Sequence, residues 1–359
     1  MESVRYGIVG FGGIAENRIA KEGFALGSQP SSENSRLAQL VCASDKNPAR
    51  EAAARALGLE WYADSDSLLA DSSIEAVVIA TNNRTHAAIA RAALETGKHV
   101  FLEKPAGVTL DEVTSLVALA RSKRLSLGID HMMTKNSYNQ MVKGVLKDKK
   151  IGKIQHMVLH MEFPFGMDPS EATTWRCSDP GELGGPIGDV GSHCLYMAEF
   201  LTDDTISCLQ CLYTPKHLAT AVEDGAIIHI TLASGGTGTI RVAFDQPRGS
   251  LSSTIRNLGY EVYGTEGTLY TYGTLFQLSG HAWEPVKIQV FSDVNGKIEE
   301  LVPESIQNIY ESQLYEHALS IRTGDLLDGD LALHNLSMIL LAHESALTGG
   351  QPMNVEILK

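Results

Sequence analysis

This 359-residue chain has few cysteines, no long apolar run and no excess of positive charge. The five cysteines are an odd number and thinly spread, so we expect reduced thiols rather than a disulfide framework. No uninterrupted apolar run reaches the ~18 residues that a membrane-spanning helix needs. The N-terminal residues lead straight into an apolar strand without a charged and apolar leader. We therefore expect a cytoplasmic protein with no membrane partner.

The formal net charge of −14 argues against nucleic acid and against an anionic membrane surface as partners. It does not exclude a ligand with phosphate groups, because backbone amides can hold such groups locally. Cys208 and Cys211 have the spacing of a zinc ligand pair, but no second pair lies near them. We interpret them as strand thiols and expect no metal. The length of the chain exceeds a usual single core, which predicts two domains.

A glycine-rich turn follows the first predicted strand, at residues 4–10. The pattern Gly-x-Gly-x-x-Ala between a strand and a helix is typical of a dinucleotide site. The first glycine allows a tight turn, the second lets the backbone approach a diphosphate, and the alanine lets helix and strand pack closely. We predict that the cofactor contacts of this turn are Gly10, Gly12, Gly13, Ile14 and Ala15.

Asp45 follows the second predicted strand, at residues 38–43. An acid at this place accepts hydrogen bonds from the adenosine ribose and would repel a 2′-phosphate, which favours NAD. Lys46 and Arg50 follow closely and leave NADP as the alternative. The spacing from the glycines exceeds the usual ~20 residues, and we interpret 27–32 as a loop insertion. The alternative interpretation of Asp45 is a helix cap. Asn47 fits that cap better, because a proline follows Asn47 directly.

The stretch His99–Pro105 predicts a short buried strand that ends in Glu103-Lys104-Pro105. The carboxyl end of a parallel strand is where open α/β sheets bind ligands. A surface lysine that merely ends a strand is the alternative interpretation of Lys104. The segment 81–86 ends another predicted strand and should face the same crevice, with His86 either in the site or exposed in a first helical turn.

Strands and helices alternate up to residue 130, which predicts a parallel sheet with helices on both faces. We therefore expect a nucleotide-binding domain at 1–131 and a second domain at 132–359. In the second domain, strand-like segments follow one another without helices between them, which predicts a largely antiparallel sheet. Closing helices are expected at 314–322 and 331–347. Helices on one face only would leave the other face for a partner subunit.

The segment Gly184–His193 differs from scaffold sequence in its glycines, its aspartate and its histidine. Asp189 fits an N-cap for a helix that runs through Phe200, and His193 then falls on the same side of its first turn. A helix amino end would lower the pKa of a histidine and stabilise a developing alkoxide. The alternative is a capping aspartate with a histidine buried in the helix seam.

Taken together, these motifs resemble the Gfo/Idh/MocA oxidoreductases, named for glucose–fructose oxidoreductase, inositol dehydrogenase and rhizopine catabolism. The resemblance covers essentially the whole chain. It is carried by Gly-x-Gly-x-x-Ala at 10–15, Thr-x-Asn-x-x-His at 81–86, Glu-Lys-Pro at 103–105, Gly-Gly-x-x-x-Asp-x-Gly-x-His at 184–193, and the closing segment 328–352.

The resemblance implies a Rossmann domain followed by an α/β domain with a large open, mostly antiparallel sheet, assembled as a homodimer or homotetramer through that sheet. It also implies that Lys104 lies near the nicotinamide ribose and the substrate hydroxyl, with Asp189 and His193 at the substrate. Besides the glycine turn, Asp45 and Lys46, we expect cofactor contacts from Thr81, Asn82, Asn83, His86, Glu103, Lys104, Trp175 and Arg176.

The chain departs from the family pattern at two places. Asn82 stands where the family usually has proline, and Gly128–Met133 replaces a segment that often carries an aromatic residue, an asparagine and an arginine. Both positions border the expected substrate pocket. The identity of the substrate is therefore left open.

The resemblance and the motifs predict reversible hydride transfer between NAD, or alternatively NADP, and a secondary hydroxyl of a sugar, an inositol or a related cyclic polyol. His193 is the predicted general base, Lys104 positions the hydroxyl and stabilises the alkoxide, and Asp189 orients His193 or holds a neighbouring hydroxyl. Three alternatives are a ligand sensor that binds cofactor without turnover, an NADP-dependent reductase, and a glycosidase that uses bound NAD for transient oxidation.

Overall fold

The computed structural model describes residues 1–26, 36–246, 250–251, 254–255 and 257–356. The chain divides into two compact units, Met1–Met132 with Gln307–Leu336 and Met133–Ile306 with Ser337–Lys359. The loop insertion predicted at 27–32 lies outside the described residues.

The first unit includes residues 307–336, whereas the sequence prediction placed everything after residue 131 in the second domain. The helix α9 (Ile309–Thr323) explains the difference, because it packs against η1 (Ala15–Gly23). Leu314 and Ala318 of α9 complete the apolar core around the first sheet. The amphipathic pattern of a helix shows that it packs, but not which of two sheets it packs on.

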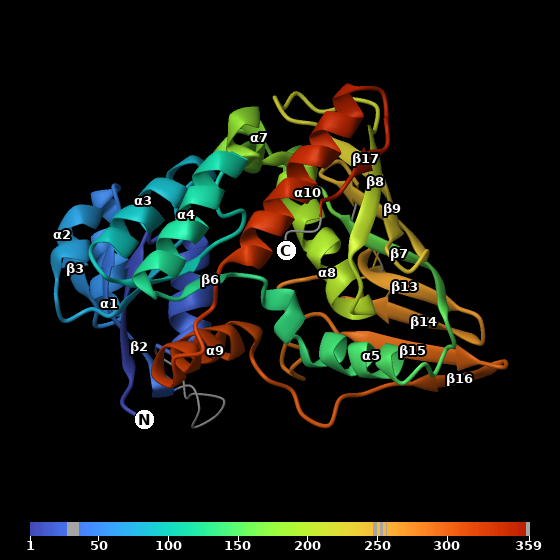
Figure 1. The fold of residues 1–359 in the computed structure, drawn as a ribbon, viewed down its shortest axis with the longest axis horizontal. Helices are drawn as coiled ribbons and strands as arrows, with labels where there is room; N and C mark the ends of the chain where they lie inside the picture. The colour runs from blue at the N-terminus through green and yellow to red at the C-terminus, as the bar shows by residue number, and fades with distance from the viewer. Residues whose placement is uncertain (27–35, 247–249, 252–253, 256, 357–359) are drawn as a thin grey trace. The chain divides into compact units, whose positions relative to one another are not determined.

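Among the described residues, the first unit contains a six-stranded parallel sheet in the order β3-β2-β1-β4-β5-β6 (Figure 1). The predicted parallel sheet is confirmed, and β3 is a short strand that the sequence prediction did not include. The strands are β1 (Val4–Val9), β2 (Ala38–Ser44), β3 (Glu60–Tyr62), β4 (Ala76–Ile79), β5 (His99–Leu102) and β6 (Leu127–Ile129).

Short polar signals begin and end the helices of this unit. Asn47 accepts a hydrogen bond from the Ala49 N–H at 3.1 Å and begins η3, as predicted. Thr109 and Glu112 form a reciprocal capping box at the start of α4. The helices are η1, η3 (Pro48–Arg50), α1 (Glu51–Ala56), α2 (Ser65–Ala70), α3 (Asn83–Glu95), α4 (Leu110–Lys123) and α9.

His317 of α9 is fully buried in the core of the first unit. Its Nδ1 lies 2.9 Å from the Tyr6 hydroxyl, and its ring centroid lies 5.5 Å from that of Phe101. Burial, and to a lesser extent the nearby His99, lower the pKa of His317 to about 3. The imidazole is therefore neutral in the folded protein at every pH above that value.

We expect His317 to make the protein sensitive to acid. The unfolded chain binds a proton at this residue near pH 6.5, but the folded chain does so only near pH 3. Stability is therefore lost as the pH falls through this window, by up to about 1.4 kcal/mol per pH unit. Urea unfolding of His317→Gln and wild type at pH 7, 5 and 4 measures this. Parallel losses in both proteins would contradict the assignment.

Among the described residues, the second unit contains a nine-stranded sheet in the order β16-β15-β14-β13-β7-β10-β9-β8-β17 (Figure 1). Neighbouring strands are antiparallel except β7 and β10, so the mostly antiparallel prediction is confirmed. The strands are β7 (Ile154–Glu162), β8 (Ile206–Tyr213), β9 (Gly225–Leu232), β10 (Thr237–Ala243), β13 (Leu258–Gly264), β14 (Gly267–Tyr272), β15 (Gln289–Val294), β16 (Lys297–Glu300) and β17 (Met353–Asn354).

One face of this sheet is covered by helices and the other is more exposed. Along β7, Met157 and Leu159 are buried, while His156 and Val158 are partly exposed. The helix α8 packs on β7 and also contacts α5. The helices are η4 (Met132–Lys135), α5 (Ser137–Lys147), η5 (Phe165–Met167), α6 (Pro169–Ala172), α7 (Trp175–Ser178), η6 (Pro180–Glu182), η7 (Ile187–Gly191), α8 (Ser192–Thr202) and α10 (Asp330–Leu347), whose residues up to Leu336 belong to the first unit.

A second, two-stranded sheet pairs β11 (Ser250–Leu251) with β12 (Thr254–Ile255). Within the described part of the chain, no helix is both long and apolar enough to cross a bilayer. No group of three or more His, Cys, Asp or Glu residues in that part is arranged to hold a metal ion.

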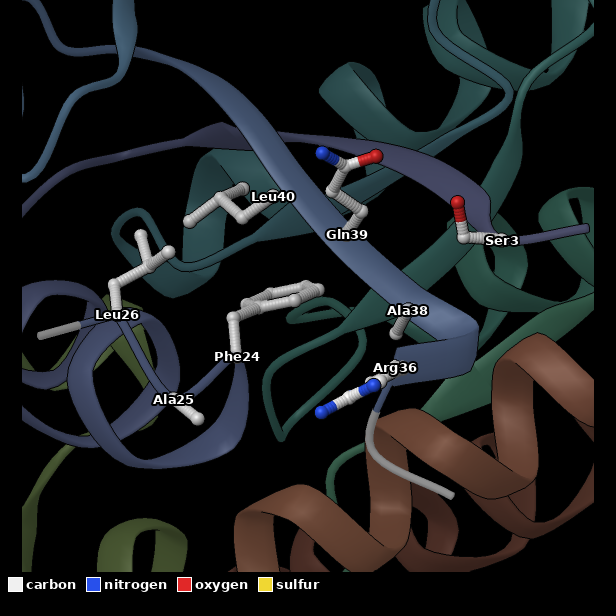
Figure 2. A pocket seen from close by; sticks show the side chains of 8 residues that line it. All are labelled: Ser3, Phe24, Ala25, Leu26, Arg36, Ala38, Gln39 and Leu40. Carbon is white, nitrogen blue, oxygen red and sulfur yellow. The ribbon is translucent and has the colours of Figure 1, made fainter. Parts of the chain in front are cut away.

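A cavity of about 340 Å³ lies at the edge of the first sheet where β1 and β2 begin, beside the end of η1 (Figure 2). Phe24 and Leu40 line it with apolar side chains, while Ser3, Arg36 and Gln39 supply polar atoms. Ser3 directly precedes β1 and residues 38–40 begin β2, whereas the glycine turn follows the end of β1. This cavity is therefore separate from the predicted nucleotide edge.

Candidate active site

The glycine turn follows β1 and leads into η1. Gly10 has a φ of +88°, and a Cβ at this residue would lie 2.7 Å from the Ala80 carbonyl oxygen. The Gly10 N–H donates to the Ser44 carbonyl at 2.9 Å, which ties the turn to the end of β2. Only glycine fits such a position without strain and collision.

Gly12 and Gly13 differ from Gly10 in the space around them. A Cβ at either residue would meet no atom within 4 Å, and neither has a positive φ. The fold itself would therefore accept a side chain at both positions. The open space lies beside the amino end of η1, where backbone N–H groups suit a diphosphate. These residues fit a dinucleotide, and the adjoining Ala15 is buried as the motif predicts.

Arg50, which the sequence placed near the ribose of the cofactor, contacts the glycine turn from the end of η3. Its Nε donates to the Phe11 carbonyl at 2.6 Å, and its guanidinium forms an ion pair with Glu16 of η1. Lys21 forms an ion pair with the same carboxylate at 2.7 Å. Together with these hydrogen bonds, the two cations hold the pKa of Glu16 below its usual range despite some desolvation. Arg50 thus connects the helix after β2 to the glycine turn.

Asp45 lies at the end of β2, where the sequence prediction put it. Its Oδ1 accepts a hydrogen bond from the Asn47 N–H at 2.8 Å, so one oxygen also stabilises the local turn. The side chain is partly exposed, and Lys46 beside it is exposed. Both residues are thus at the sheet edge that the glycine turn occupies, and a ribose contact by Asp45 remains a prediction.

His86 joins two strand ends. Its Nδ1 lies 2.7 Å from the Pro105 carbonyl oxygen, and its Nε2 lies 3.1 Å from the Thr81 carbonyl oxygen. The ring is 1% exposed, so it is not the exposed first-turn residue considered as an alternative. A neutral imidazole carries one N–H and donates to one of these two carbonyl oxygens, so we interpret His86 as a tie at the strand ends, and its cofactor contact stays a prediction. Asn83 beside it is also buried, and Asn82 precedes α3 without a side-chain cap.

Lys104 follows β5 and is partly exposed. The Glu103 N–H donates to the Ile79 carbonyl at 3.0 Å, so the pairing of β5 with β4 extends to the residue before the lysine. The Lys104–Pro105 peptide is cis. Thr81, Glu103 and Lys104 therefore follow adjacent strands of one parallel sheet, which brings them to the same edge as the glycine turn.

The helix that carries Asp189 begins earlier than predicted. The π-helical segment η7 continues directly into α8, so Asp189 lies inside the helical segment and the N-cap prediction is wrong. Gly185, with a φ of +69°, and the helical Pro186 begin this segment. The Glu223 Oε1 accepts a hydrogen bond from the Ile187 N–H at 2.9 Å and does the capping from a distant part of the chain.

His193 lies in α8 beyond the first helical turn, so the prediction that a helix amino end acts on it is also wrong. The side chain is buried at 3% exposure, and its Nδ1 lies 2.7 Å from the Tyr196 hydroxyl. The two rings are nearly perpendicular, at 76°. Tyr196 is a partner that the sequence prediction missed, although a tyrosine three residues along a helix is within reach.

Arg176 links α7 to the Asp189 carboxylate, with its Nε 3.5 Å from Oδ1. Its guanidinium also stacks over the ring of Trp175 at 4.3 Å. Trp175, Arg176, Asp189 and His193 thus all belong to the second unit, whereas Lys104 belongs to the first. Their convergence on one substrate remains a prediction.

Two family profiles match this chain. Residues 4–131 match an oxidoreductase family with an NAD-binding Rossmann fold. Residues 139–270 match the GFO/IDH/MocA C-terminal domain. The first match covers the whole parallel sheet, and the second covers the second sheet from β7 to β14.

The sequences of individual relatives have low identity to that of this chain. The chain is 25% identical over 349 residues to 1,5-anhydro-D-fructose reductase of Ensifer adhaerens, covering 96% of this chain and 97% of that protein. It is 28% identical to scyllo-inositol 2-dehydrogenase (NAD(+)) of Bacillus subtilis, covering 66% and 67%. The solved structure of levoglucosan dehydrogenase with NADH and levoglucosan has a TM-score of 0.81 at 19% identity, covering 99% and 100%. At that identity the structural likeness shows the fold.

Proposed function

This chain belongs to the Gfo/Idh/MocA oxidoreductases and is an NAD(P)-dependent enzyme of that family, and we propose that it oxidises or reduces a sugar or cyclic polyol. The reacting group is a secondary hydroxyl or the corresponding ketone. The names of its relatives, a reductase of 1,5-anhydro-D-fructose and an inositol dehydrogenase, support this substrate class. When bound, the nicotinamide of the cofactor supplies the hydride acceptor or donor.

The observation that carries the proposal is the buried pair of His193 and Tyr196. A neutral imidazole donates from one nitrogen and accepts at the other. If Nδ1–H donates to the Tyr196 oxygen, Nε2 is the nitrogen that takes the hydroxyl proton. The imidazolium formed in this step keeps its hydrogen bond to Tyr196, so the ring does not need to reorient as it gains charge.

Lys104 and Asp189 have supporting roles in the proposed reaction. The ammonium of Lys104, at the sheet edge of the first unit, would position the hydroxyl and stabilise its alkoxide form. The Asp189 carboxylate is held by Arg176 and would orient His193 or a neighbouring substrate hydroxyl. We further propose a homodimer or homotetramer that assembles through the more exposed face of the second sheet.

The test of this function is turnover on a panel of inositols, hexoses and uronates with NAD⁺ and NADP⁺, followed by nicotinamide absorbance. The expected result is reduction of the cofactor with at least one cyclic polyol or sugar. Cofactor binding without turnover on any panel member would favour the ligand sensor instead. Release of sugar from glycosides without net reduction of the cofactor would favour the glycosidase.

Asp45→Ala is expected to relax the preference for NAD⁺ over NADP⁺ by about 10- to 100-fold in kcat/KM, because it removes a charged hydrogen-bond acceptor and its repulsion of a 2′-phosphate. Steady-state kinetics with both cofactors measures the ratio. Asp328→Ala is the matched control, since Asp328 accepts the Asp330 N–H at 3.0 Å in a similar turn of the same unit. An unchanged ratio in Asp45→Ala would remove this residue from the ribose site.

A further inference from the structure

Two acidic side chains follow adjacent strands at the sheet edge that carries Lys104. Leu102 of β5 pairs with Ile129 of β6, and Glu103 and Asp130 are the next residue on each strand. The Asp130 N–H donates to the Leu102 carbonyl at 2.8 Å, so the pairing of the two strands extends to the aspartate. The carboxyl groups therefore lie side by side, and Asp130 belongs to the segment that departs from the family pattern.

Asp130 is 1% exposed, and its hydrogen bonds are specific. Its Oδ1 accepts from the Met132 N–H at 3.1 Å and from the Gln313 side-chain amide of α9. A further hydrogen bond joins its carboxyl group to Glu103. Two carboxylates cannot share a hydrogen bond unless one of them carries a proton. Oδ1 already accepts twice, which leaves Oδ2 for Glu103, and the proton belongs on Asp130 because Asp130 is buried whereas Glu103 is partly exposed.

The surroundings support the same assignment of the proton. Burial first, and the neighbouring Glu103 charge second, raise the pKa of Asp130 well above its usual range. Tyr310 of α9 is also buried, and its hydroxyl has no hydrogen-bond partner among the described residues. Burial raises the pKa of Tyr310 well above its usual range, so it stays neutral.

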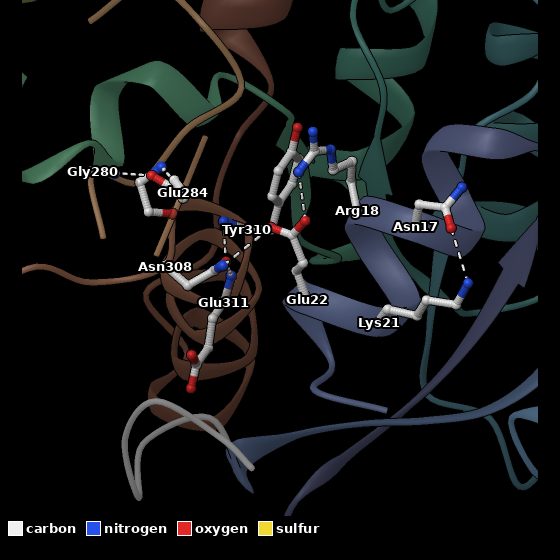
Figure 3. A network of polar contacts seen from close by, with 10 residues as sticks. Asn17, Arg18, Lys21, Glu22, Gly280, Glu284, Asn308, Tyr310 and Glu311 are labelled. Atoms are coloured by element: carbon white, nitrogen blue, oxygen red, sulfur yellow. Dashed lines mark hydrogen bonds and ion pairs between the residues drawn. The ribbon is translucent and has the colours of Figure 1, made fainter. Parts of the chain in front are cut away.

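Two further charged residues near Tyr310 come from the helix η1. Arg18 and Glu22 are paired at 2.6 Å beside the tyrosine, and Asn308 donates to Glu22 at 3.2 Å (Figure 3). The buried His131 follows Asp130 directly in the chain. The acid pair is thus enclosed by α9 and by its own strand ends.

We propose that Asp130 is a positioning residue, which donates a hydrogen bond to Glu103 and so fixes the Glu103-Lys104-Pro105 turn that presents the Lys104 ammonium. This inference rests on the proposed function, in which Lys104 positions the reacting hydroxyl. In this arrangement Gln313 and the Met132 N–H orient the Asp130 carboxyl group, and Glu103 retains the negative charge next to the lysine.

Asp130→Asn and Asp130→Ala test the proposal together. The asparagine amide donates to Glu103 and its oxygen accepts from Gln313 and Met132, so kcat is expected to stay within about threefold of wild type. Alanine removes the donor, and kcat is expected to fall by about 10- to 100-fold as the lysine shifts, with a smaller change in the KM for NAD. An alanine variant with wild-type kcat would overturn the positioning role.

The pH dependence of stability tests the proton. In the unfolded chain Asp130 ionises near pH 4, whereas in the folded chain it keeps its proton to higher pH. Wild type therefore loses stability as the pH rises above about 4, and Asp130→Asn escapes this loss. The Tm of Asp130→Asn minus that of wild type should increase from pH 5 to pH 9. A constant difference, or one that decreases, would show that Asp130 is ionised and would overturn the proposal.

Lys104→Met separates this inference from the proposed function. Loss of turnover in Lys104→Met with normal turnover in Asp130→Ala would overturn the inference alone. Normal turnover in Lys104→Met would overturn the role of the lysine itself. If Asp130→Ala does not fold, Gln313→Leu replaces it, because it releases the orienting hydrogen bond while the acid remains. Its kcat should fall in the same direction, and wild-type kcat would again overturn the proposal.

Discussion

Replacing His193 by alanine is expected to lower kcat by about 10²- to 10⁴-fold, while the Kd for NAD stays within about twofold. The imidazole is the proposed acceptor of the hydroxyl proton, and it lies in the second unit, whereas the glycine turn lies in the first. Turnover with the substrate found in the panel and equilibrium titration of NAD give the two quantities. Wild-type kcat in His193→Ala would remove the general base from the mechanism.

The chain contains a matched control for this substitution. His343 of α10 also pairs through Nδ1 with a tyrosine hydroxyl, that of Tyr213 at 2.9 Å, and it belongs to the same unit. His343→Ala removes a similar side chain and a similar hydrogen bond, so it should cost stability without a selective loss of kcat. Tyr196→Phe should lower kcat less than His193→Ala and shift its pH profile, because the phenylalanine no longer accepts from Nδ1–H.

The parallel sheet could be predicted because its signals are local. Short apolar runs mark β1, β4 and β5, and caps such as Asn47 and the Thr109–Glu112 box lie within a few residues of the helices that they begin. The β15–β16 hairpin was missed, although Asn295-Gly296 between the two strands is a strong turn signal and both residues have positive φ.

The candidate site could be predicted only in part, because several of its contacts join distant segments. The motif indicated Asp189 and His193, but the cap of their helix comes from Glu223, which no local pattern connects to Ile187. The hydrogen bond from Gln313 to Asp130 joins residues 183 positions apart. Such contacts depend on the packing of α9 and of the strand ends, which hydrophobic periodicity does not specify.

Gly12→Val is expected to raise the Kd for NAD by at least about 100-fold, equivalent to about 2.7 kcal/mol, and to leave Tm nearly unchanged. A Cβ at Gly12 would meet no protein atom within 4 Å, so the fold accepts the side chain. The added methyl groups would instead occupy the space through which a diphosphate approaches the amino end of η1. Titration of NAD and thermal unfolding without cofactor measure the two effects separately.

Gly10→Ala should show the reverse pattern and is therefore the control. Its Cβ would lie 2.7 Å from the Ala80 carbonyl oxygen and from Thr81 Cγ2, at a φ of +88°, so the backbone must move. Collision and left-handed strain together should destabilise the fold by about 2–5 kcal/mol. The two glycines thus separate what the turn needs in order to fold from what it needs in order to bind. Wild-type NAD affinity in Gly12→Val would show that the diphosphate lies elsewhere, whatever the stability of Gly10→Ala.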